Sequence, residues 1–296
     1  MSDLSVETLS HGQQERLAFI EFRLLFLDEL RRSDICEKFS IGPAGATRDI
    51  DLYRKLAPKN LHFNQKTKYY RLDKHFIPIF SHSIHRALNA LLNGFGDGVY
   101  SLPPQINCTT PVSLNTPCIE ILSSVTRAIK HKKIIRIKYL SKSSGWSNRD
   151  IAPFALVSNG NRWHTRAYDR KTAEFRDFVL LRITDSQTLK CSPLDEETVE
   201  SDIQWNRWVE LQLVPHPEQA CAEAVALDCG IEDGILSVKL RAAVAGYFLR
   251  QWNVDCSREH RLKGHEYDLW LSNPLELYGV KNALIAPGYD LEELEK

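Results

Sequence analysis

A stretch rich in proline, serine and threonine, SLPPQINCTTPVSLNTPC at 101–118, divides the chain into two parts of different character. Before it, apolar residues such as Leu17, Ile20 and Leu24 recur at helical spacing, whereas after it short runs alternate at the period of a strand. So many turn-forming residues together are typical of a linker. With 296 residues, the chain also suits two or three domains better than one core. We therefore predict an α+β multidomain protein.

Charge is segregated along the chain although the net charge is zero. Residues 47–74 hold 8 lysines and arginines against 3 acids, residues 125–193 hold 15 against 5, and residues 194–296 hold 9 against 20. Two basic segments followed by an acidic one indicate that the first two face polyanions. Ordinary solvated surface charge is the alternative for each segment taken alone.

The N-terminal half carries the pattern of a helix-turn-helix. Apolar spacing predicts a core helix over 13–30, and Ser33 is placed to cap a short second helix. Gly42 and Pro43 break that helix, and a longer one follows from Pro43 to Leu56. In a helix-turn-helix, the second helix of such a pair enters the major groove of DNA.

Two strand-like runs in LHFNQKTKYYRL predict a β-hairpin around residues 64–67, with basic residues at its tip. Together with the helices, the hairpin describes a winged helix-turn-helix over residues 1–83. Phosphate contacts by its basic residues would make binding steeply salt-dependent. The residues expected to bind DNA are Thr47, Arg48, Arg54, Lys66 and Lys68. A helical interaction module that binds no DNA is the alternative.

Residues 84–118 are expected to form a connector, with an amphipathic helix over 84–97 that ends at glycine and is followed by the linker. The sequence GFGDG at 94–98 follows a helix rather than a strand, which disfavours a nucleotide-binding loop. His82 and His85 have i,i+3 spacing, but no third ligand is evident. We therefore expect solvated surface histidines there rather than a metal site.

The central segment, residues 119–193, predicts one helix followed by short antiparallel strands, a pattern that indicates a small barrel or curled sheet. The helix spans 119–131, and the strands span 133–141, 149–158, 162–170 and 175–185. In the third strand, Trp163, Thr165 and Ala167 alternate with Arg162, His164, Arg166 and Tyr168. A face with two arginines is costly unless it meets water or an anion.

The motifs IKYLSKSSG, RDIAP, RWHTRAYD and FRDFVLLRI resemble the WYL domain, a ligand-sensing module with an Sm/SH3-like β-barrel, in order and in spacing. The resemblance covers nearly the whole chain, because the preceding winged helix-turn-helix and the acidic C-terminal extension also match the family's layout. The family's Trp-Tyr-Leu tripeptide is Trp163-His164-Thr165 here. That departure resembles the BrxR/CapW type of repressor, which accompanies phage-defence operons.

For the WYL family, the resemblance implies a basic pocket for an anionic ligand, such as a nucleotide or an oligonucleotide. Arginine offers a planar fork of donors for phosphate, hydroxyls add neutral donors, and tyrosine stacks on a base. The residues carried over are Tyr139, Ser141, Ser143, His164, Arg166, Arg176 and Arg182. For each of these residues, a purely structural role is the alternative. Arg182 could pair with Asp177 or Asp185, while Trp163 is expected in the core and Arg170 at the surface.

Residues 194–296 predict a small α+β domain, with strands at 208–217 and 234–243 and helices at 218–227 and 244–254. The acidic run DEETVESD at 195–202 is expected to be a solvated loop. The resemblance implies an extension domain used in dimer formation and in covering a partner's ligand pocket. Arg241 is a candidate for reaching such a pocket, with ordinary strand-surface charge as the alternative.

The chemistry-bearing motifs of enzymes are missing from the sequence: it has no nucleophile elbow, P-loop, HExxH or paired carboxylate motif. We predict no catalytic residue, no cofactor and no metal. None of the seven cysteines forms a CxxC pair, which fits reduced thiols. No apolar run approaches the roughly 20 residues needed to span a bilayer, and the N-terminus lacks a signal pattern. We therefore expect a cytoplasmic protein without membrane contact.

These features predict a sequence-specific DNA-binding transcriptional regulator. We expect a homodimeric repressor of its own or an adjacent phage-defence operon, which binds double-stranded DNA at an inverted-repeat operator. An anionic ligand at the WYL domain would modulate that binding. The alternative is a nucleic-acid-sensing accessory protein that binds single strands through the WYL domain and modulates a partner effector enzyme.

Overall fold

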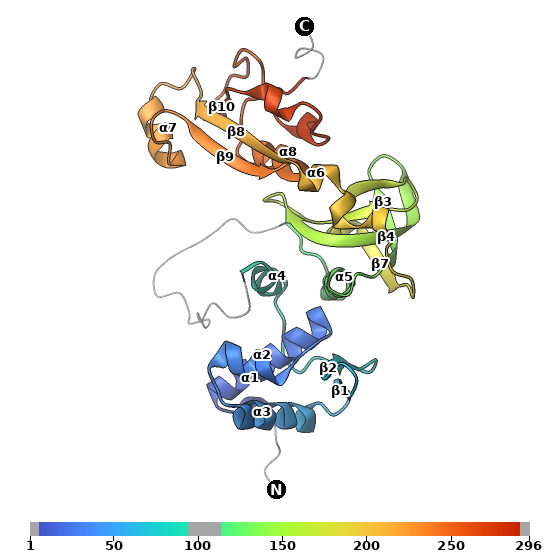
Figure 1. Cartoon of the computed structure of the whole chain (residues 1–296). Coiled ribbons are helices and arrows are strands. Elements are labelled where there is room, and N and C mark those ends of the chain that lie inside the picture. The colour runs from blue at the N-terminus through green and yellow to red at the C-terminus, as the bar shows by residue number, and fades with distance from the viewer. Residues whose placement is uncertain (1–5, 94–113, 291–296) are drawn as a thin grey trace. The chain divides into compact units, whose positions relative to one another are not determined.

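The computed structural model describes residues 6–93 and 114–290 of the chain (Figure 1). The chain divides into two compact units. The first unit comprises residues 1–148 and 181–190, and the second comprises residues 149–180 and 191–296. Within the described residues, no helix is long and apolar enough to cross a membrane.

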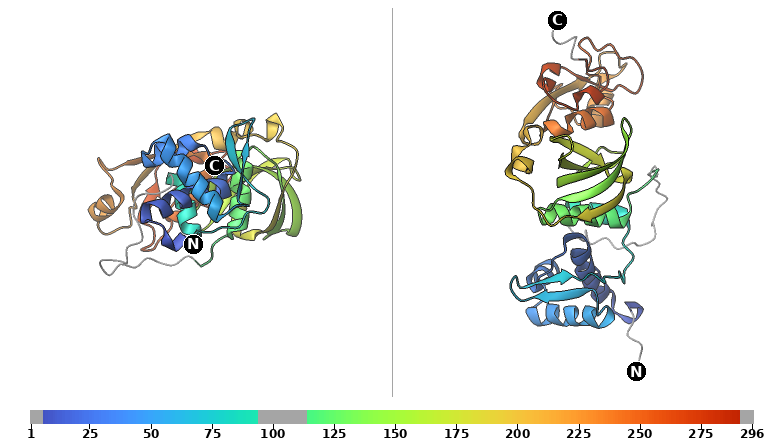
Figure 2. Two further views of the ribbon diagram at one scale, coloured as in Figure 1. Left: turned by 90° about the horizontal axis from the view of Figure 1, so that it is seen from below. Right: turned by 90° about the vertical axis from the view of Figure 1, so that its right-hand side faces the viewer.

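The first unit begins with a winged helix. Its helices are α1 (His11–Phe22), which continues into the π-helical turn η2 (Arg23–Leu27), then α2 (Arg32–Phe39) and α3 (Pro43–Leu56). The strands β1 (Leu61–Asn64) and β2 (Tyr69–Leu72) pair antiparallel as the wing, which lies beside α3 (Figure 2). Side chains from all three helices form the core, among them Leu17, Ile20, Ile35, Ile50 and Tyr53. The predicted helix-turn-helix and the limits of α3 are confirmed.

Two details of the first helices differ from the sequence prediction. The first helix ends at Leu27 rather than Leu30, because Asp28 adopts a left-handed conformation with φ of 51°. Leu30 instead forms an isolated β-bridge with Tyr70 of the wing. The prediction that Ser33 caps α2 is wrong. The carboxylate of Asp34 accepts the backbone N–H of Arg31 at 2.8 Å, so the helix begins one residue before Ser33.

Helix α4 (Ile84–Asn93) begins where the sequence predicted. Its predicted end near residue 97 and most of the predicted linker lie outside the described residues. Helix α5 (Ile119–Lys130) follows, close to its predicted limits. The hydroxyl of Thr126 donates to the carbonyl of Phe26 at 2.8 Å, and the guanidinium of Arg127 donates to the carbonyl of Leu25 at 2.7 Å. Because the last carbonyls of a helix lack helical partners, these bonds tie α5 to the winged helix.

Five strands follow: β3 (Ile135–Ser141), β4 (Gly145–Ser158), β5 (Trp163–Asp169), β6 (Glu174–Val179) and β7 (Ile183–Thr188). Their order in the sheet is β6-β5-β4-β3-β7. The single strand predicted over 175–185 is wrong, because the 3₁₀ turn Leu180–Arg182 separates β6 from β7. β6 and β7 stand at opposite ends of the order, so the sheet is open over the described residues and the Sm/SH3-like barrel is not confirmed.

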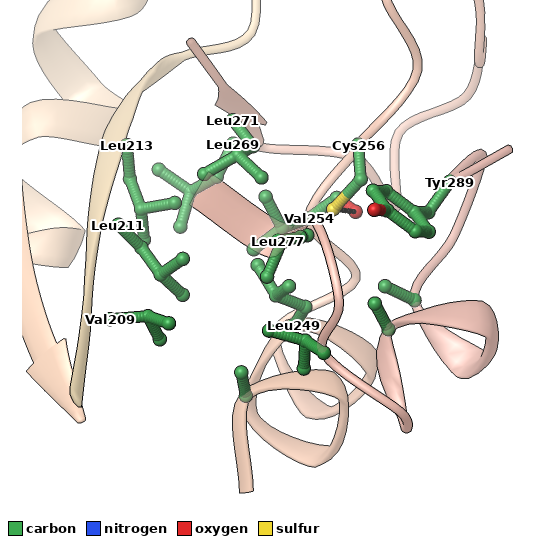
Figure 3. Close-up of a cluster of buried hydrophobic side chains, with 14 of the residues drawn as sticks. Val209, Leu211, Leu213, Leu249, Val254, Cys256, Leu269, Leu271, Leu277 and Tyr289 are labelled. Carbon is green, nitrogen blue, oxygen red and sulfur yellow. Dashed lines mark hydrogen bonds between the residues drawn. The ribbon is translucent and has the colours of Figure 1, made fainter. Parts of the chain in front are cut away.

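The C-terminal part of the second unit is a small α+β domain, as predicted. Its elements are β8 (Trp208–Pro215), α7 (Ala222–Cys229), β9 (Leu236–Arg241), α8 (Ala242–Gln251) and β10 (Leu269–Leu271). The sheet order is β10-β8-β9, and β10 had no counterpart in the sequence prediction. Leu211 and Leu213 of β8 meet Leu249 of α8 and Leu271 of β10 in the core (Figure 3).

Candidate nucleic-acid interface and anion cleft

Helix α3 presents a cationic face on the winged helix. Arg48 and Arg54 are exposed, while Ile50 and Tyr53 on the other side of the helix are buried in the core. Pro43 occupies the first turn, where its missing N–H costs nothing and its fixed φ suits a helix. The apolar pattern of the helix therefore determines which side chains face the solvent.

The exposed arginines of α3 have weak partners on their own helix, and the guanidinium of Arg54 also lies 5.8 Å from the ring centroid of Tyr70 in the wing. The guanidinium of Arg48 donates to the carbonyl of Ala44 at 3.3 Å, and that of Arg54 lies 3.5 Å from the carboxylate of Asp51. An exposed pair of this kind contributes little, and an arginine has five N–H donors. Both side chains therefore retain donors for a phosphate or a base.

The wing adds a second cationic group next to α3. Lys66 and Lys68 are exposed in the turn between β1 and β2. Asn64 shapes this turn, because its side-chain oxygen accepts the backbone N–H groups of Lys66 and Thr67 at 3.0 and 3.2 Å. Thr47 of α3 is half-buried and accepts a hydrogen bond from Arg32 of α2 at 3.4 Å. Arg32 is a neighbour of the predicted DNA contacts that the sequence pattern did not single out.

The buried carboxylate of Glu21 binds the side of α3 that faces the core. Glu21 of α1 is fully buried and accepts hydrogen bonds from the hydroxyl of Tyr53 at 2.8 Å and from the backbone N–H of Ile79 at 2.9 Å. The ring of His82 lies 3.0 Å from the same carboxylate. The prediction of a solvated His82 is therefore wrong. Burial is the main cause that raises the pKa of Tyr53, so its hydroxyl remains a donor.

Strand β5 is buried on both faces, which differs from the sequence prediction. The exposed fraction is 4% for His164, 5% for Arg166 and 0% for Thr165. Groups from outside the sheet cover this strand, because Asp202 binds Arg166 and the ring of Tyr247 stacks on His164. The cationic side chains of β5 therefore meet protein groups rather than bulk water.

Arg166 is bound by two carboxylates. Its Nε and Nη2 donate to Asp202 at 2.6 and 3.1 Å, and its Nη1 donates to Asp177 of β6 at 3.0 Å. Burial alone lowers the pKa of Arg166, but the hydrogen bonds and charges of the two carboxylates outweigh it, so the pKa stands above its ordinary value. Asp202 also caps the short helix α6 (Ile203–Asn206) by accepting two of its backbone N–H groups. Arg166 thus joins β5, β6 and α6.

Arg170 forms a second pair with the acidic run at 195–202. Its guanidinium donates to both carboxylate oxygens of Glu197, at 2.6 and 2.7 Å. Glu197 and Asp202 are 4% and 1% exposed, so the prediction of a fully solvated acidic loop is wrong. Glu197 lies 27 residues after Arg170, and Asp202 lies 36 residues after Arg166, so no local sequence pattern predicts these pairs.

His164 packs behind the arginine cluster. Its ring stacks on that of Tyr247 of α8 at 5.2 Å between centroids, and the Tyr247 hydroxyl donates to Asp177 at 2.8 Å. Burial lowers the pKa of His164 and favours the neutral imidazole. Within the described residues, the Nδ1 atom of His164 is buried without a hydrogen-bond partner.

A cleft of about 350 Å³ opens beside Arg166 within the second unit. Its polar lining residues are Arg166, Glu174, Arg176, Asp177, Gln204, Tyr247, Lys281 and Asn282. Gly246 lets α8 approach the segment that carries Asn282, because a Cβ atom at 246 would lie 1.9 Å from the Asn282 carbonyl oxygen. The described residues contain no group of three or more histidine, cysteine or acidic side chains that could hold a metal ion.

Two of the seven predicted ligand residues, Arg166 and Arg176, line this cleft, and His164 stacks on a third lining residue, Tyr247. The other four lie in the first unit, namely Tyr139 buried in β3, Ser141 and Ser143 with their hydroxyls 3.1 Å apart, and Arg182 in the 3₁₀ turn. Sequence reasoning missed Gln204, Tyr247, Lys281 and Asn282, because the three separate segments that carry them have no ligand motif.

Arg241, the predicted candidate for reaching a partner's pocket, is held by its own chain. Its guanidinium lies 4.9 and 4.7 Å from the ring centroids of Trp205 and Trp208, and it donates to the Trp205 carbonyl at 2.6 Å. Such stacking is a common use of arginine. The geometry therefore matches the alternative of a strand-surface charge.

Three family models match successive parts of the chain. They are the BrxR transcriptional regulator winged helix-turn-helix domain over residues 12–93, the WYL domain over 120–188 and the BrxR transcriptional regulator C-terminal dimerization domain over 208–277. Together they cover the winged helix, the five-stranded sheet and most of the C-terminal domain.

Proteins similar over most of their length are named DNA-binding transcriptional repressor CapW. The protein of Escherichia coli strain KTE188 is 31% identical, over 91% of this chain and 92% of its own. That of Pseudomonas aeruginosa is 32% identical over 82% and 84% of the two chains. Among solved structures, proteasome accessory factor B/C of Arthrobacter aurescens covers 92% of this chain and 48% of its own at 17% identity, but its TM-score of 0.27 is too low to carry an argument.

Proposed function

The chain belongs to the BrxR and CapW family of WYL-domain regulators, and on that basis we propose that it is a DNA-binding transcriptional repressor. The observation that carries this proposal is the 31% identity to a CapW repressor over 91% of the chain, which includes the winged helix and the C-terminal domain. The cationic face of α3, which retains free donors, supports it. We assign residues 1–83 to DNA binding, 84–118 to the connector, 119–193 to the WYL domain and 194–296 to dimerisation.

In this proposal, α3 enters the major groove and the wing contacts the DNA backbone. Thr47, Arg48 and Arg54 face the bases and nearby phosphates, while Lys66 and Lys68 neutralise phosphates beside the groove. The protein acts as a homodimer through its C-terminal domain. A two-fold dimer requires an inverted-repeat operator with half-sites about one or more helical turns apart. The operator controls the repressor's own or an adjacent phage-defence operon.

An anionic ligand modulates the repressor through its WYL domain. The cleft beside Arg166 supports this part of the proposal, because Arg176 and Lys281 stand at its rim and Tyr247 offers a ring and a hydroxyl. A ligand shifts the DNA-binding equilibrium only by its different affinity for the two states of the repressor. The remaining predicted contacts, Tyr139, Ser141, Ser143, His164 and Arg182, are retained as expected ligand residues.

The test is fluorescence anisotropy with duplex DNA from upstream of the gene, at several salt concentrations. We expect a sequence-specific complex that weakens steeply with salt. Arg48→Ala should weaken it by about ten-fold or more, as expected for one lost base or phosphate contact. The matched control is Arg250→Ala, which removes an exposed arginine of the C-terminal domain and should leave the affinity unchanged. Single-strand binding without duplex preference would overturn the proposal.

A further inference from the structure

Asp177 occupies the place in the cleft where an anion would meet its best donors. One carboxylate oxygen accepts the Nη1–H of Arg166 at 3.0 Å, and the other accepts the hydroxyl of Tyr247 at 2.8 Å. The side chain of Asp177 is 10% exposed and lines the cleft. A charged and a neutral donor therefore already converge on one anionic group, which belongs to the protein itself.

The inner part of the cleft is electrostatically unfavourable for an anion of low charge. Arg166 carries one positive charge and is bound by Asp177 and Asp202, so this buried group has a net charge of −1, and three of the five N–H donors of the guanidinium are bonded to these carboxylates. A further anion meets a net negative charge there unless it replaces one of the carboxylates. Asp202 also caps α6, whereas Asp177 lies on the cleft wall, so Asp177 is the carboxylate that can leave.

The rim of the cleft has the opposite balance. Arg176 pairs with Glu174 at 2.9 Å, and both side chains are about half exposed, with fractions of 48% and 46%. Lys281 lies close enough to the same carboxylate to help lower the pKa of Glu174, after the larger effect of Arg176. Two cations thus share one acid at the rim. An anion is attracted to the rim and meets Asp177 further in.

We propose that Asp177 is an internal competitor for the ligand, and that a phosphate monoester displaces it from Arg166 and Tyr247. This inference rests on the proposed ligand-sensing function of the cleft. A monoester carries about −1.5 to −2 charges at pH 7 and three strong acceptor oxygens, so it outcompetes a carboxylate of charge −1. A phosphodiester carries one charge and gains nothing by the exchange. The cleft therefore selects terminal phosphate groups over internal phosphodiesters.

The displacement also provides a path to the C-terminal domain. Tyr247 lies on α8 and stacks on His164, so a new partner for its hydroxyl changes a contact between β5 and α8. Both elements belong to the second unit. Phosphate occupancy is thus sensed by the helix that packs directly on the core of the domain proposed for dimerisation.

The test compares methyl phosphate with dimethyl phosphate by isothermal titration calorimetry on the full-length protein at pH 7.5. The wild type should bind the monoester at least about ten-fold more tightly than the diester, because only the dianion repays displacement of Asp177. Asp177→Asn keeps the shape of the side chain and removes its charge. This variant should bind both esters, gain about ten-fold or more for the diester and lose most of the preference.

Two further variants separate this exchange from a general charge effect. Glu174→Gln removes a carboxylate at the rim, so it should strengthen binding of both esters, that of the more highly charged monoester at least as much, and therefore keep the preference for the monoester. Tyr247→Phe removes one of the two donors to Asp177 and should alter the preference without removing a charge. Thermal unfolding of each variant monitors folding, and Tyr247→Phe provides an independent result if Asp177→Asn is unstable.

Equal binding of the two esters by the wild type would overturn the inference, as would an unchanged preference or no binding of either ester in Asp177→Asn. Operator affinity is measured on the same preparations. Intact operator binding with no phosphate preference defeats this inference alone. Phosphate selectivity without any operator binding defeats the proposed repressor function, and the competitor role of Asp177 then stands as a property of the cleft.

Discussion

The exposed arginines of α3 differ in their surroundings from Arg166 in β5 and Arg170 just beyond its end. Arg48 and Arg54 are exposed, and their partners are neighbours on their own helix and, for Arg54, the ring of Tyr70 in the wing. Arg166 and Arg170 are bound by Asp202 and Glu197, from a segment that follows them in the chain. A cluster of basic residues therefore indicates a polyanion-binding surface only where no acidic segment of the same chain folds against it. Here the acidic C-terminal segment neutralises part of the second basic segment.

This difference separates cations that are paired within the fold from those exposed to DNA. Loss of a buried arginine that is bound by two carboxylates is destabilising, mainly because it leaves two negative charges buried without a cation. An exposed arginine contributes little to stability and much to long-range attraction of phosphate. Substitutions in the two groups should therefore affect different measurements, folding in one case and DNA binding in the other.

The largest effect is expected for Arg166→Met, which leaves Asp177 and Asp202 buried without their cation. We expect the free energy of unfolding of the second unit to fall by about 3–5 kcal/mol. Urea unfolding followed by tryptophan fluorescence measures it, since the second unit holds Trp163, Trp205, Trp208, Trp252 and Trp270. Arg48→Met serves as the matched variant and should change stability by less than about 0.5 kcal/mol. A loss below about 1 kcal/mol for Arg166→Met would remove the distinction between the two groups.

A smaller effect is expected at the wing. Lys66→Ala and Lys68→Ala should each weaken operator binding uniformly across sequences and reduce the slope of log affinity against log salt by about 1. Arg170→Ala removes a cation that is paired with Glu197, so it should leave that slope unchanged. Anisotropy titrations over a range of salt concentrations measure all three variants. A reduced slope for Arg170→Ala would show that paired cations of the second unit also reach DNA.

His164 is the other basic residue of β5 besides Arg166, and its charge depends on pH. Burial holds its pKa below the ordinary value of about 6.5, so the folded state resists protonation. Stability is therefore fully present above about pH 6.5 and falls as the pH drops below it, by at most about 1.4 kcal/mol per pH unit. His164→Phe keeps a ring against Tyr247 and removes the titration. The difference in unfolding free energy between the wild type and this variant should change between pH 7.5 and 5.5, and a constant difference would contradict the assignment.

How far the sequence predicts the structure depends on whether the signal is local. The limits of α3 were predictable because Pro43 starts the helix and Pro58 lies just beyond its end. The break between β6 and β7 was not, because the turn Leu180–Arg182 contains neither glycine nor proline. His82 was wrongly predicted to be solvated, because its partner Glu21 is 61 residues away in the chain and no local signal indicates the contact.

The cleft shows the same limit. Arg166 and Arg176 followed from the resemblance to a known domain, and both line the cleft. Tyr247 and Lys281 come from separate segments with no ligand motif, and only the fold brings them to the same place. Asp177, the proposed internal competitor, directly follows Arg176 in the motif FRDFVLLRI, whose arginines were predicted to bind the ligand. Alternation along β6 predicts opposite faces for the two side chains, whereas both line the cleft, and it does not predict which donors each one meets.

The smallest expected effect concerns the pair of Arg170 and Glu197. Burial raises the pKa of Glu197, but hydrogen bonds from Arg170 and from the backbone N–H of Leu194, together with the charge of Arg170, outweigh it, so the pKa lies below its ordinary value. A carboxyl with a lowered pKa stabilises the fold above its unfolded pKa of about 4.3, and that contribution is lost as the pH falls below this value. Because the Arg170 side chain is 30% exposed, solvent screening should keep the contribution below about 1 kcal/mol.

Glu197→Gln isolates this contribution. It retains a hydrogen-bond acceptor for Arg170 and removes the charge, so its melting temperature should change less between pH 6 and pH 3.5 than that of the wild type. Glu174→Gln is the matched control, because Glu174 pairs with Arg176 on the surface where water screens both charges. If Glu174→Gln flattened the pH profile as much as Glu197→Gln, exposed and buried pairs would be equivalent. The exposed and the paired arginines would then differ only in their accessibility, and not in the strength of their ion pairs.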